Sequence, residues 1–379
     1  MAADQPYRLF LPCAPGLEPW LLAEVRAVGG IRPRTVAGGV EIEANEHVLD
    51  RCLLEVGLAL DVRLRLAELP APGFDAVVRR TRSLPWLDFV GPGQAVEVRA
   101  TARRSRLHHT GAIAERVREG IQGAVGSLAS DSEGVGPWRV FARMEDDRLT
   151  LSLSLAGEPL SRRGYRLASA KAPLREDLAR AVLVMSGWTP EHALVDPFCG
   201  SGTLAVEAAL LATRTPPGWG RAFHWTRAPT FDRARWDRIR AQLEAGRRAA
   251  PAPILASDRD AGAVEAARAN AERAGVSDAV RLAVAALGKA PFPDRELGWW
   301  ISNPPYGGRI GRGSDLRDLY QAIGQRFAQL GSGWRLGLLV DAPKWAHLTG
   351  VELESQVLLD HGGRKVRFHL SPPRGRPAT

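Results

Sequence analysis

The chain has 379 residues, of which 45% are hydrophobic and 25% are charged. This composition is typical of a folded protein of two or three domains and excludes an intrinsically disordered one. Lys and Arg number 51 against 42 Asp and Glu, which gives a net charge of +9, and only four of the 51 are lysines. Because arginine binds phosphate bidentately and stacks on bases, the charge favours a nucleic-acid partner. A GC-rich genome would also enrich arginine, so the alternative stays open.

The cysteines, the histidines and the N-terminal sequence argue against a disulfide-rich, metal-binding, secreted or membrane protein. Three widely spaced cysteines make no disulfide scaffold and no C-x-x-C metal site, and the histidines lack ligand spacing. We therefore expect no bound metal. The N-terminal MAADQPYRLFLPCAPG has no basic region followed by an apolar core, and no uncharged apolar run approaches the ~20 residues that cross a bilayer. These features predict a soluble, cytoplasmic protein without a membrane partner, and we expect a monomer.

The first 160 residues read as a small α+β arrangement. Strand patterns occur in YRLFLP, GGVEIEA, LDVRLRLAEL and QAVEVRAT. Helical spacing occurs in PGLEPWLLAEVRAVGG, HVLDRCLLEVG, FDAVVRRTRSLPW and HHTGAIAERVREGIQGAV. WRVFARMEDDRLTLSLSLAG predicts a strand pair that turns at residues 145–147, and the non-periodic segment EPLSRRGYRLASAKAPL marks a domain boundary.

After that boundary, strands alternate with helices of 10–15 residues. The strand patterns include HALVD, PILASD, AVRLAV, LGWWIS and WRLGLLV. This alternation predicts a mostly parallel, doubly wound sheet. The stretch PPGWGRAFHWTRAPTFDRARWD interrupts it as an insertion, in which we interpret Trp219 and Trp225 as packing residues, with substrate contact as the alternative.

The strongest local motif follows the apolar strand HALV. It comprises Asp196, Pro197, Phe198, Cys199, Gly200, Ser201, Gly202 and Thr203. The glycines let the backbone pass close to a ligand, and the following helix presents free N–H groups. An acidic residue at the strand end argues against a dinucleotide fingerprint, and no phosphate-binding G-x-x-x-x-G-K-[ST] loop is present. A ligand with an amino-acid moiety, such as S-adenosylmethionine, fits this pattern better.

Two further motifs follow at later strand ends. Asp258 ends the next strand, where a carboxylate can accept both ribose hydroxyls of a nucleoside cofactor, whereas Asp260 is expected to cap the following helix. After the strand WWIS, the sequence continues with Asn303, Pro304, Pro305 and Tyr306. The Asn303 amide oxygen and the Pro304 carbonyl can accept both hydrogens of an exocyclic amine, and Tyr306 can stack on its base.

Together these motifs resemble the class I S-adenosylmethionine-dependent methyltransferases that modify exocyclic amines. The opening LFLPCAPGLEPWLLAEVRAVGG, the linker RRGYR and DPFCGSGTLAVEAALLAT resemble THUMP-containing RNA guanine-N2 methyltransferases, especially the N-terminal half of the enzyme that makes N2-methylguanosine in 23S ribosomal RNA. The resemblance implies a ferredoxin-like subdomain at 1–60, a THUMP RNA-binding domain at 61–160 and a Rossmann-like methyltransferase domain at 161–379.

The resemblance also implies roles for single residues. The motif 196–203 would surround the methionine part of the cofactor, Asp258 would bind its ribose, and 303–306 would hold the target guanine. Lys171–Arg175 would lie over the cofactor. The residues expected to bind RNA are Arg99, Arg103, Arg104, Arg106, Arg162, Arg163, Arg166 and Lys171.

One position departs from the family pattern. Ala286 stands where the family carries an acidic residue that accepts from the adenine amino group, and such a hydrogen bond is worth ~1 kcal/mol. This leaves a non-catalytic RNA-binding or assembly protein as an alternative to the rRNA enzyme. A tRNA guanine-N2 methyltransferase is a second alternative. Adenine-N6 methylation of DNA and glutamine methylation of protein also use N-P-P-Y, but the THUMP-like N-terminus argues against them.

Overall fold

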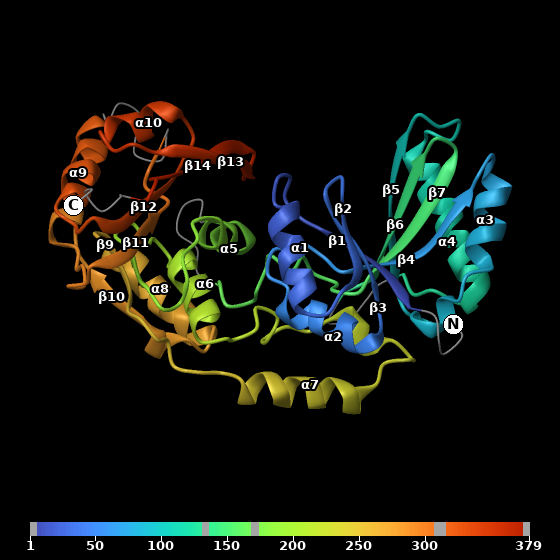
Figure 1. The fold of residues 1–379 in the computed structure, drawn as a ribbon. Helices are drawn as coiled ribbons and strands as arrows, with labels where there is room; N and C mark the ends of the chain where they lie inside the picture. Colours follow the sequence, from blue (N-terminus) through green and yellow to red (C-terminus); the bar gives the residue numbers. More distant parts are fainter. Residues whose placement is uncertain (1–5, 131–135, 168–173, 307–315, 374–379) are drawn as a thin grey trace. The chain divides into compact units, whose positions relative to one another are not determined.

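The computed structural model describes residues 6–130, 136–167, 174–306 and 316–373 and divides into two compact units (Figure 1). Unit 1 comprises Met1–Cys13, Leu21–Leu160 and Arg221–Ala241. Unit 2 comprises Ala14–Trp20, Ser161–Gly220 and Gln242–Thr379. A segment of the insertion therefore belongs to unit 1, although the elements on either side of it in the chain belong to unit 2.

Unit 1 is built on one sheet, whose described strands run in the order β2-β3-β1-β4-β7-β6-β5. The strands are β1 (Tyr7–Pro12), β2 (Ile31–Val36), β3 (Gly39–Ala44), β4 (Arg63–Pro70), β5 (Val96–Arg103), β6 (Trp138–Glu145) and β7 (Arg148–Ser154). The pair β5–β6 is parallel and the other pairs are antiparallel. The helices are α1 (Glu18–Ala27), α2 (Glu46–Glu55), α3 (Phe74–Arg82), α4 (Thr110–Val125) and α7 (Arg233–Ala245), with 3-10 turns at Trp86–Asp88 and His224–Arg227. The division into units falls within α1, after Trp20, and within α7, after Ala241.

Local chemistry explains several of these boundaries. The Asn45 side chain accepts from the Val48 N–H at 2.9 Å and so begins α2. Asp146 and Asp147 both have positive φ, 49° and 58°, which confirms the predicted turn between β6 and β7. The strand β2 was not predicted. It lies at the sheet edge and contains Pro33, which removes a backbone donor and is tolerated only at such edges.

Unit 2 contains the predicted Rossmann-like sheet, whose described strands run in the order β10-β9-β8-β11-β12-β14-β13. The strands are β8 (Ala193–Asp196), β9 (Ile254–Asp258), β10 (Val280–Val284), β11 (Leu297–Ser302), β12 (Gly333–Val340), β13 (Glu354–His361) and β14 (Arg364–Leu370). The helices are α5 (Glu176–Met185), α6 (Thr203–Ala212), α8 (Ala261–Arg273), α9 (Arg317–Ala328) and α10 (Pro343–Leu348), with 3-10 turns at Ser277–Ala279 and Leu287–Lys289.

The first five strands of this sheet are mutually parallel, which confirms the predicted architecture. The hairpin β13–β14 adds two antiparallel strands and makes the sheet mixed. It was not predicted, although Gly362 and Gly363 both adopt positive φ in its turn.

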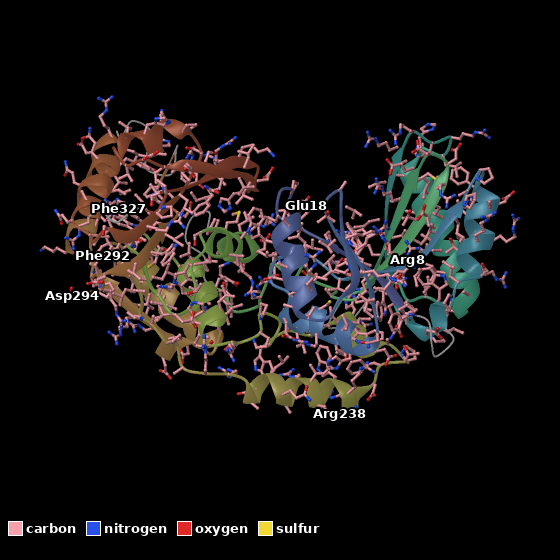
Figure 2. The ribbon with its side chains drawn as sticks, viewed as in Figure 1. Arg8, Glu18, Arg238, Phe292, Asp294 and Phe327 are labelled. Atoms are coloured by element: carbon pink, nitrogen blue, oxygen red, sulfur yellow. The ribbon has the colours of Figure 1, made fainter. Side chains whose placement is uncertain are left out.

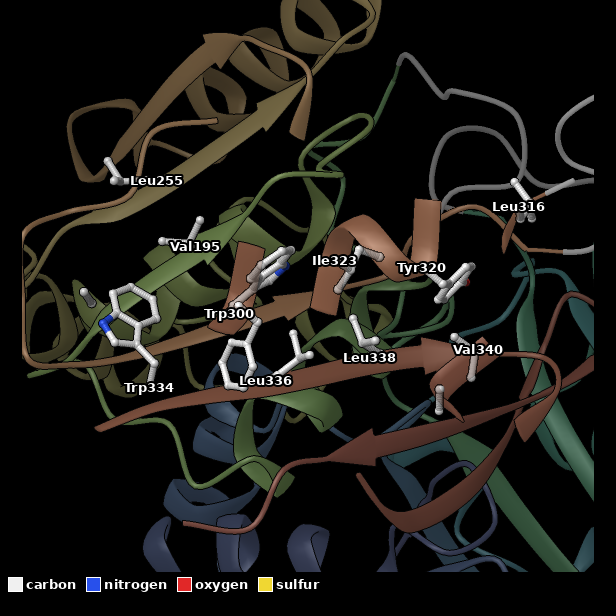
Figure 3. Packing of buried hydrophobic residues seen from close by; sticks show 13 residues of the cluster. Val195, Leu255, Trp300, Leu316, Tyr320, Ile323, Trp334, Leu336, Leu338 and Val340 are labelled. Atoms are coloured by element: carbon white, nitrogen blue, oxygen red, sulfur yellow. The ribbon is translucent and has the colours of Figure 1, made fainter. Parts of the chain in front are cut away.

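The core of unit 2 fixes the strands that carry the site. Trp300 on β11 and Trp334, Leu336 and Leu338 on β12 are fully buried. Figure 3 shows these side chains in one buried cluster that also includes Ile323 of α9. Phe327 of the same helix is also fully buried, whereas Arg238 and Asp294 are exposed (Figure 2). Because these large side chains are closely packed, the ends of the strands that carry them are held in fixed positions.

Candidate active site

A cavity of about 600 Å³ lies at the carboxyl ends of the parallel strands of unit 2. Ligand crevices in doubly wound sheets form at this edge. Its lining includes Asp196–Ser201 and Thr203 after β8, Asp258 at the end of β9, and Asn303 and Pro305 after β11. The structure thus brings the three predicted motifs together around one cavity. Gly202, Pro304 and Tyr306 are not among its described lining residues.

The glycine loop depends on its two glycines. Gly200 and Gly202 have φ of +51° and +80°, values that L side chains rarely adopt. A Cβ on Gly202 would lie 2.8 Å from the Ala267 Cβ on α8, so the loop packs directly on that helix. Asn270 on α8 is buried and donates from Nδ2 to the Ser201 carbonyl at 2.9 Å. Sequence reasoning missed Asn270, because its spacing along α8 looks like any other interior helical position.

Asp196 is a buried carboxylate in the cavity wall. The Ser302 hydroxyl donates to Asp196 Oδ1 at 2.7 Å and the Phe198 N–H donates to the same oxygen at 3.1 Å. Oδ2 forms no hydrogen bond with any of the residues that the structure describes. Burial raises the pKa of Asp196 to about 7. A cationic group in the cavity would stabilise its ionised form.

Asp258 is held by the backbone of two segments. The Gly200 N–H donates to its Oδ2 at 3.0 Å and the Asp260 N–H donates to its Oδ1 at 3.0 Å. Each carboxylate oxygen keeps a further lone pair for a hydroxyl donor. Asp260 accepts from the Gly262 and Ala263 N–H groups and begins α8, which confirms the predicted cap.

Asn303 presents an unsatisfied acceptor. Asn303 lines the cavity, and its Oδ1 is buried and lacks a hydrogen-bond partner among the described residues. The carbonyl of Pro305 already accepts from the Tyr320 hydroxyl at 3.1 Å. Since buried polar atoms are nearly always paired, the Asn303 oxygen indicates a donor that arrives from a ligand. Tyr306 is fully buried, and base stacking would require it to move.

After β10 the described cavity lining consists of Ala285–Gly288 and contains no carboxylate, with Ala286 at the position where the family pattern predicts an acid. Gln325, Arg326 and Gln329 line the same cavity from α9 and the residue after it. No sequence motif pointed to these α9 residues. Cys199 is buried with its pKa raised by that burial, so it stays a thiol.

The arginines predicted to bind RNA fall into two environments. Arg99, Arg104 and Arg106 are exposed but paired with Glu97, Asp146 and Asp147. Arg103 is 71% exposed and lies 3.9 Å from Glu145. All four side chains are accessible to a large ligand, and an acidic neighbour already offsets part of the positive charge of each.

Two of the linker arginines that were predicted to bind RNA, Arg163 and Arg166, are paired with acidic residues of the protein. Arg163 is buried and pairs with Glu207 of α6 at 3.3 Å, so the prediction that it binds RNA is wrong for this conformation. Arg166 donates to the Leu174 carbonyl and to Glu176. Arg162 is exposed, and Lys171 lies outside the described residues.

The described part of the chain contains no group of three His, Cys, Asp or Glu residues arranged to hold a metal ion. None of its helices is long and apolar enough to cross a membrane.

Comparison with known proteins places this site in a family. A model of the RMKL-like methyltransferase domain matches residues 163–352, and a model of the RlmL ferredoxin-like domain matches residues 8–59. Ribosomal RNA large subunit methyltransferase K/L of Syntrophotalea carbinolica is 32% identical over 96% of this chain, and that of Pseudomonas paraeruginosa is 34% identical over 94%. The chain spans about half the length of these curated relatives, 53% and 51%.

Solved structures of similar length match almost completely. SMU.472, a putative methyltransferase complexed with SAH, superposes with a TM-score of 0.86 at 26% identity, covering 99% of this chain and 100% of that one. A possible methylase from Clostridium difficile gives 0.88 at 26% identity, with the same coverage. Since the first model spans half of the sequence and contains the whole cavity, the chain belongs to the RMKL-like methyltransferase family.

Proposed function

We propose that this chain transfers a methyl group from S-adenosylmethionine to the exocyclic N2 of a guanosine in ribosomal RNA of the large subunit. The observation that carries the proposal is Asn303, a residue of the cavity lining whose buried Oδ1 has no hydrogen-bond partner among the described residues. The names of the relatives, which are large-subunit ribosomal RNA methyltransferases, support the choice of substrate. A THUMP domain at 61–160, a monomeric state and a cytoplasmic location are part of the same proposal.

The residues of the cavity fit the cofactor. Asp258 offers free lone pairs at a strand end, where a ribose would be recognised, and Asp196 Oδ2 offers a carboxylate oxygen to an ammonium group. The positive φ values of Gly200 and Gly202 bring the backbone close to the cavity without side chains. Bound S-adenosylmethionine supplies an electrophilic methyl group on its sulfonium.

The contribution of the chain to the reaction is orientation. Asn303 Oδ1 accepts one hydrogen of the guanine amine, and the Pro304 carbonyl accepts the other, as the N-P-P-Y motif predicts. The two acceptors turn the nitrogen lone pair towards the methyl group for in-line displacement. The amine attacks as a neutral group, so no strong base is needed, and its proton leaves afterwards to water or through Asn303.

The test compares Asn303→Ala with wild type, using labelled cofactor and protein-free large-subunit ribosomal RNA. We expect loss of methyl transfer with S-adenosylhomocysteine affinity within a few-fold of wild type. Asn45→Ala, which removes the cap of α2 in unit 1, is the matched control and should keep full activity. Near-normal turnover by Asn303→Ala would overturn the mechanism.

Two other functions are distinguished by their products. One solved relative, 25% identical with a TM-score of 0.86, is described as a predicted N6-adenine-specific DNA methylase. Nucleoside mass spectrometry after the reaction separates N2-methylguanosine from N6-methyladenosine, and separate rRNA and tRNA reactions distinguish the two RNA substrates. A non-catalytic RNA-binding protein is supported by Ala286 and predicts no S-adenosylhomocysteine binding at millimolar concentration.

A further inference from the structure

The cavity of unit 2 extends from the strand ends along one side of α9. Its lining includes Leu319, Ala322, Gln325 and Arg326 of the helix and Gln329 directly after it. Intervals of three or four residues place these side chains on one face of the helix, whereas the opposite face is buried in the core. At 1.5 Å per residue this row is about 15 Å long, so the cavity has room beyond the strand ends that carry the three motifs.

This extension exists because the connection between β10 and β11 contains no α-helix. Its residues 285–296, all of them described, form only the 3-10 turn Leu287–Lys289. Parallel strands are usually connected through an α-helix, which would cover this part of the sheet. Here α9 packs against the 3-10 turn. The cavity therefore lies between Ala285–Gly288 and α9, with apolar side chains at the start of the helix and polar side chains further along it.

An adenine base fits this part of the cavity. Since β10 is the neighbour of β9 in the sheet, the base of a nucleoside whose ribose binds Asp258 is within reach of Ala285–Gly288. The edge of adenine carries an amino group that donates and, beside it, a ring nitrogen, N1, that accepts. Ala286 has no side-chain acceptor for that amino group, and a buried donor without a partner is unfavourable. The polar side chains next to the 3-10 turn come from α9, which packs against it.

Arg326 supplies a donor whose orientation is fixed. Its Nη1 donates to Gln329 Oε1 at 2.8 Å, and its guanidinium lies 5.2 Å from the centroid of the Phe292 ring. That ring packs edge-on against Trp300 and Trp334 of the core. The Arg326 Nε is buried and has no hydrogen-bond partner among the described residues, and the side chain forms no ion pair with any of them. Since buried N–H groups are nearly always paired, this one indicates an acceptor that arrives with a ligand.

Gln325 supplies an acceptor beside that donor. It precedes Arg326 in the cavity lining, and its side chain forms no hydrogen bond with any described residue. The Gln329 oxygen is already engaged by Arg326, so the free amide oxygen belongs to Gln325. An acceptor next to a donor is complementary to the amino group and N1 of adenine. A 6-oxopurine carries a hydrogen on N1, which would oppose the Arg326 donor.

We propose that α9 recognises the adenine edge of the methyl donor, with Gln325 accepting from the amino group and Arg326 donating to N1. The inference rests on the proposed function, in which S-adenosylmethionine occupies the cavity. Gln325 then performs the role of the acid that the family pattern predicts at the position of Ala286. The two residues determine which purine the cavity accepts, and Ala286 no longer argues for a non-catalytic protein.

The test measures by calorimetry how the full chain binds S-adenosylhomocysteine and its 6-oxo analogue, S-inosylhomocysteine. We expect wild type to bind the analogue about tenfold more weakly, because the N1–H of the analogue opposes Arg326. Gln325→Ala should bind S-adenosylhomocysteine about fivefold more weakly, the effect of one lost neutral hydrogen bond. Gln325→Glu should bind it at least as tightly as wild type does and should bind the analogue more weakly than wild type does, because a carboxylate cannot donate to the oxo group.

Two further variants separate recognition of the base from a general effect on the helix. Gln321→Ala, on the same helix, exposed and outside the cavity lining, should leave both affinities unchanged. Ala286→Asp should restore the affinity of Gln325→Ala for S-adenosylhomocysteine to within about twofold of wild type, because it returns an acceptor to the same amino group.

Three results would overturn the inference and leave the proposed function standing. They are wild-type affinity in Gln325→Ala, no rescue of that variant by Ala286→Asp, and equal affinity of wild type for the two compounds. A wild-type protein that binds neither compound would overturn both the inference and the proposed function.

Discussion

Asp196 makes cofactor affinity depend on pH in a predictable direction. In the free protein, burial raises the pKa of Asp196 to about 7, so about one molecule in ten carries the carboxylate at pH 6 and about nine in ten at pH 8. The ammonium group of a bound ligand beside Oδ2 would lower this pKa, because it stabilises the ionised form. Only the ionised protein then binds well. The dissociation constant for S-adenosylhomocysteine should fall about tenfold as the pH rises from 6 to 8.

Calorimetric titration in buffers of different ionisation enthalpy measures both the dissociation constant and the number of protons released on binding. At pH 7 binding should release about half a proton, because about half of the Asp196 side chains are protonated beforehand. Asp196→Asn keeps an oxygen to accept from Ser302 and Phe198 but cannot ionise. It should bind roughly 10–100-fold more weakly at pH 8, the range for a hydrogen bond to a charged group, and without pH dependence. An unchanged pH profile in Asp196→Asn would refute the assignment.

For the protein without ligand, the raised pKa of Asp196 predicts that stability falls as the pH rises, whereas cofactor affinity increases. A carboxyl whose pKa is raised in the folded state binds its proton more tightly there than in the unfolded chain. Its contribution to stability is therefore present below about pH 4 and is lost as the pH rises through about 7. Without ligand, Asp196→Asn should melt at a higher temperature than wild type at pH 8 and at nearly the same temperature at pH 4. A lower melting temperature for the variant at pH 8 would contradict the raised pKa.

Three further substitutions test buried contacts, two beside the cavity of unit 2 and one in unit 1. Gly202→Ala should lower stability by about 2–4 kcal/mol, because the position has a positive φ and a Cβ there would clash with α8. The variant should also lose S-adenosylhomocysteine binding. A melting temperature equal to that of wild type would contradict this prediction. Asn270→Asp removes the donor to the Ser201 carbonyl, so cofactor affinity should fall about tenfold while the melting temperature changes by a few degrees at most. Trp225→Phe removes the donor 2.6 Å from buried Asp50 and should destabilise unit 1 by about 1–3 kcal/mol, with cofactor affinity unchanged in calorimetry.

Much of the candidate site was predictable because its chemistry is local in sequence. The glycines, Asp196 and Asn303 each follow an apolar strand directly, and parallel strands bring their carboxyl ends to one edge. The capping role of Asp260 was predictable for the same reason, since a cap is decided within a few residues. The alternation of strands and helices likewise predicted most of the elements in both units, but it missed β2 and the hairpin β13–β14.

The errors concern contacts between residues far apart in the chain. Arg163 lies in a basic linker, and nothing near it in sequence signals the buried pair with Glu207, 44 residues later. Neither face of the sheet in unit 1 was predicted, because that required strand register across seven strands. The register places Arg8 beside residues from β4 and β6, and a pattern read along one strand cannot supply it.

The insertion between α6 and β9 lies after the domain boundary predicted near residue 160, yet much of it belongs to unit 1. Trp225 is fully buried in unit 1, where its ring meets Tyr7 edge-on and its Nε1–H donates to Asp50. Arg235 donates to the other oxygen of Asp50 at 2.7 Å. A chain cut near residue 160 would therefore leave a buried carboxylate without either donor, a cost of several kcal/mol. The fold of unit 1 is therefore completed by a segment that the chain supplies between α6 and β9, although the elements on either side of that segment belong to unit 2.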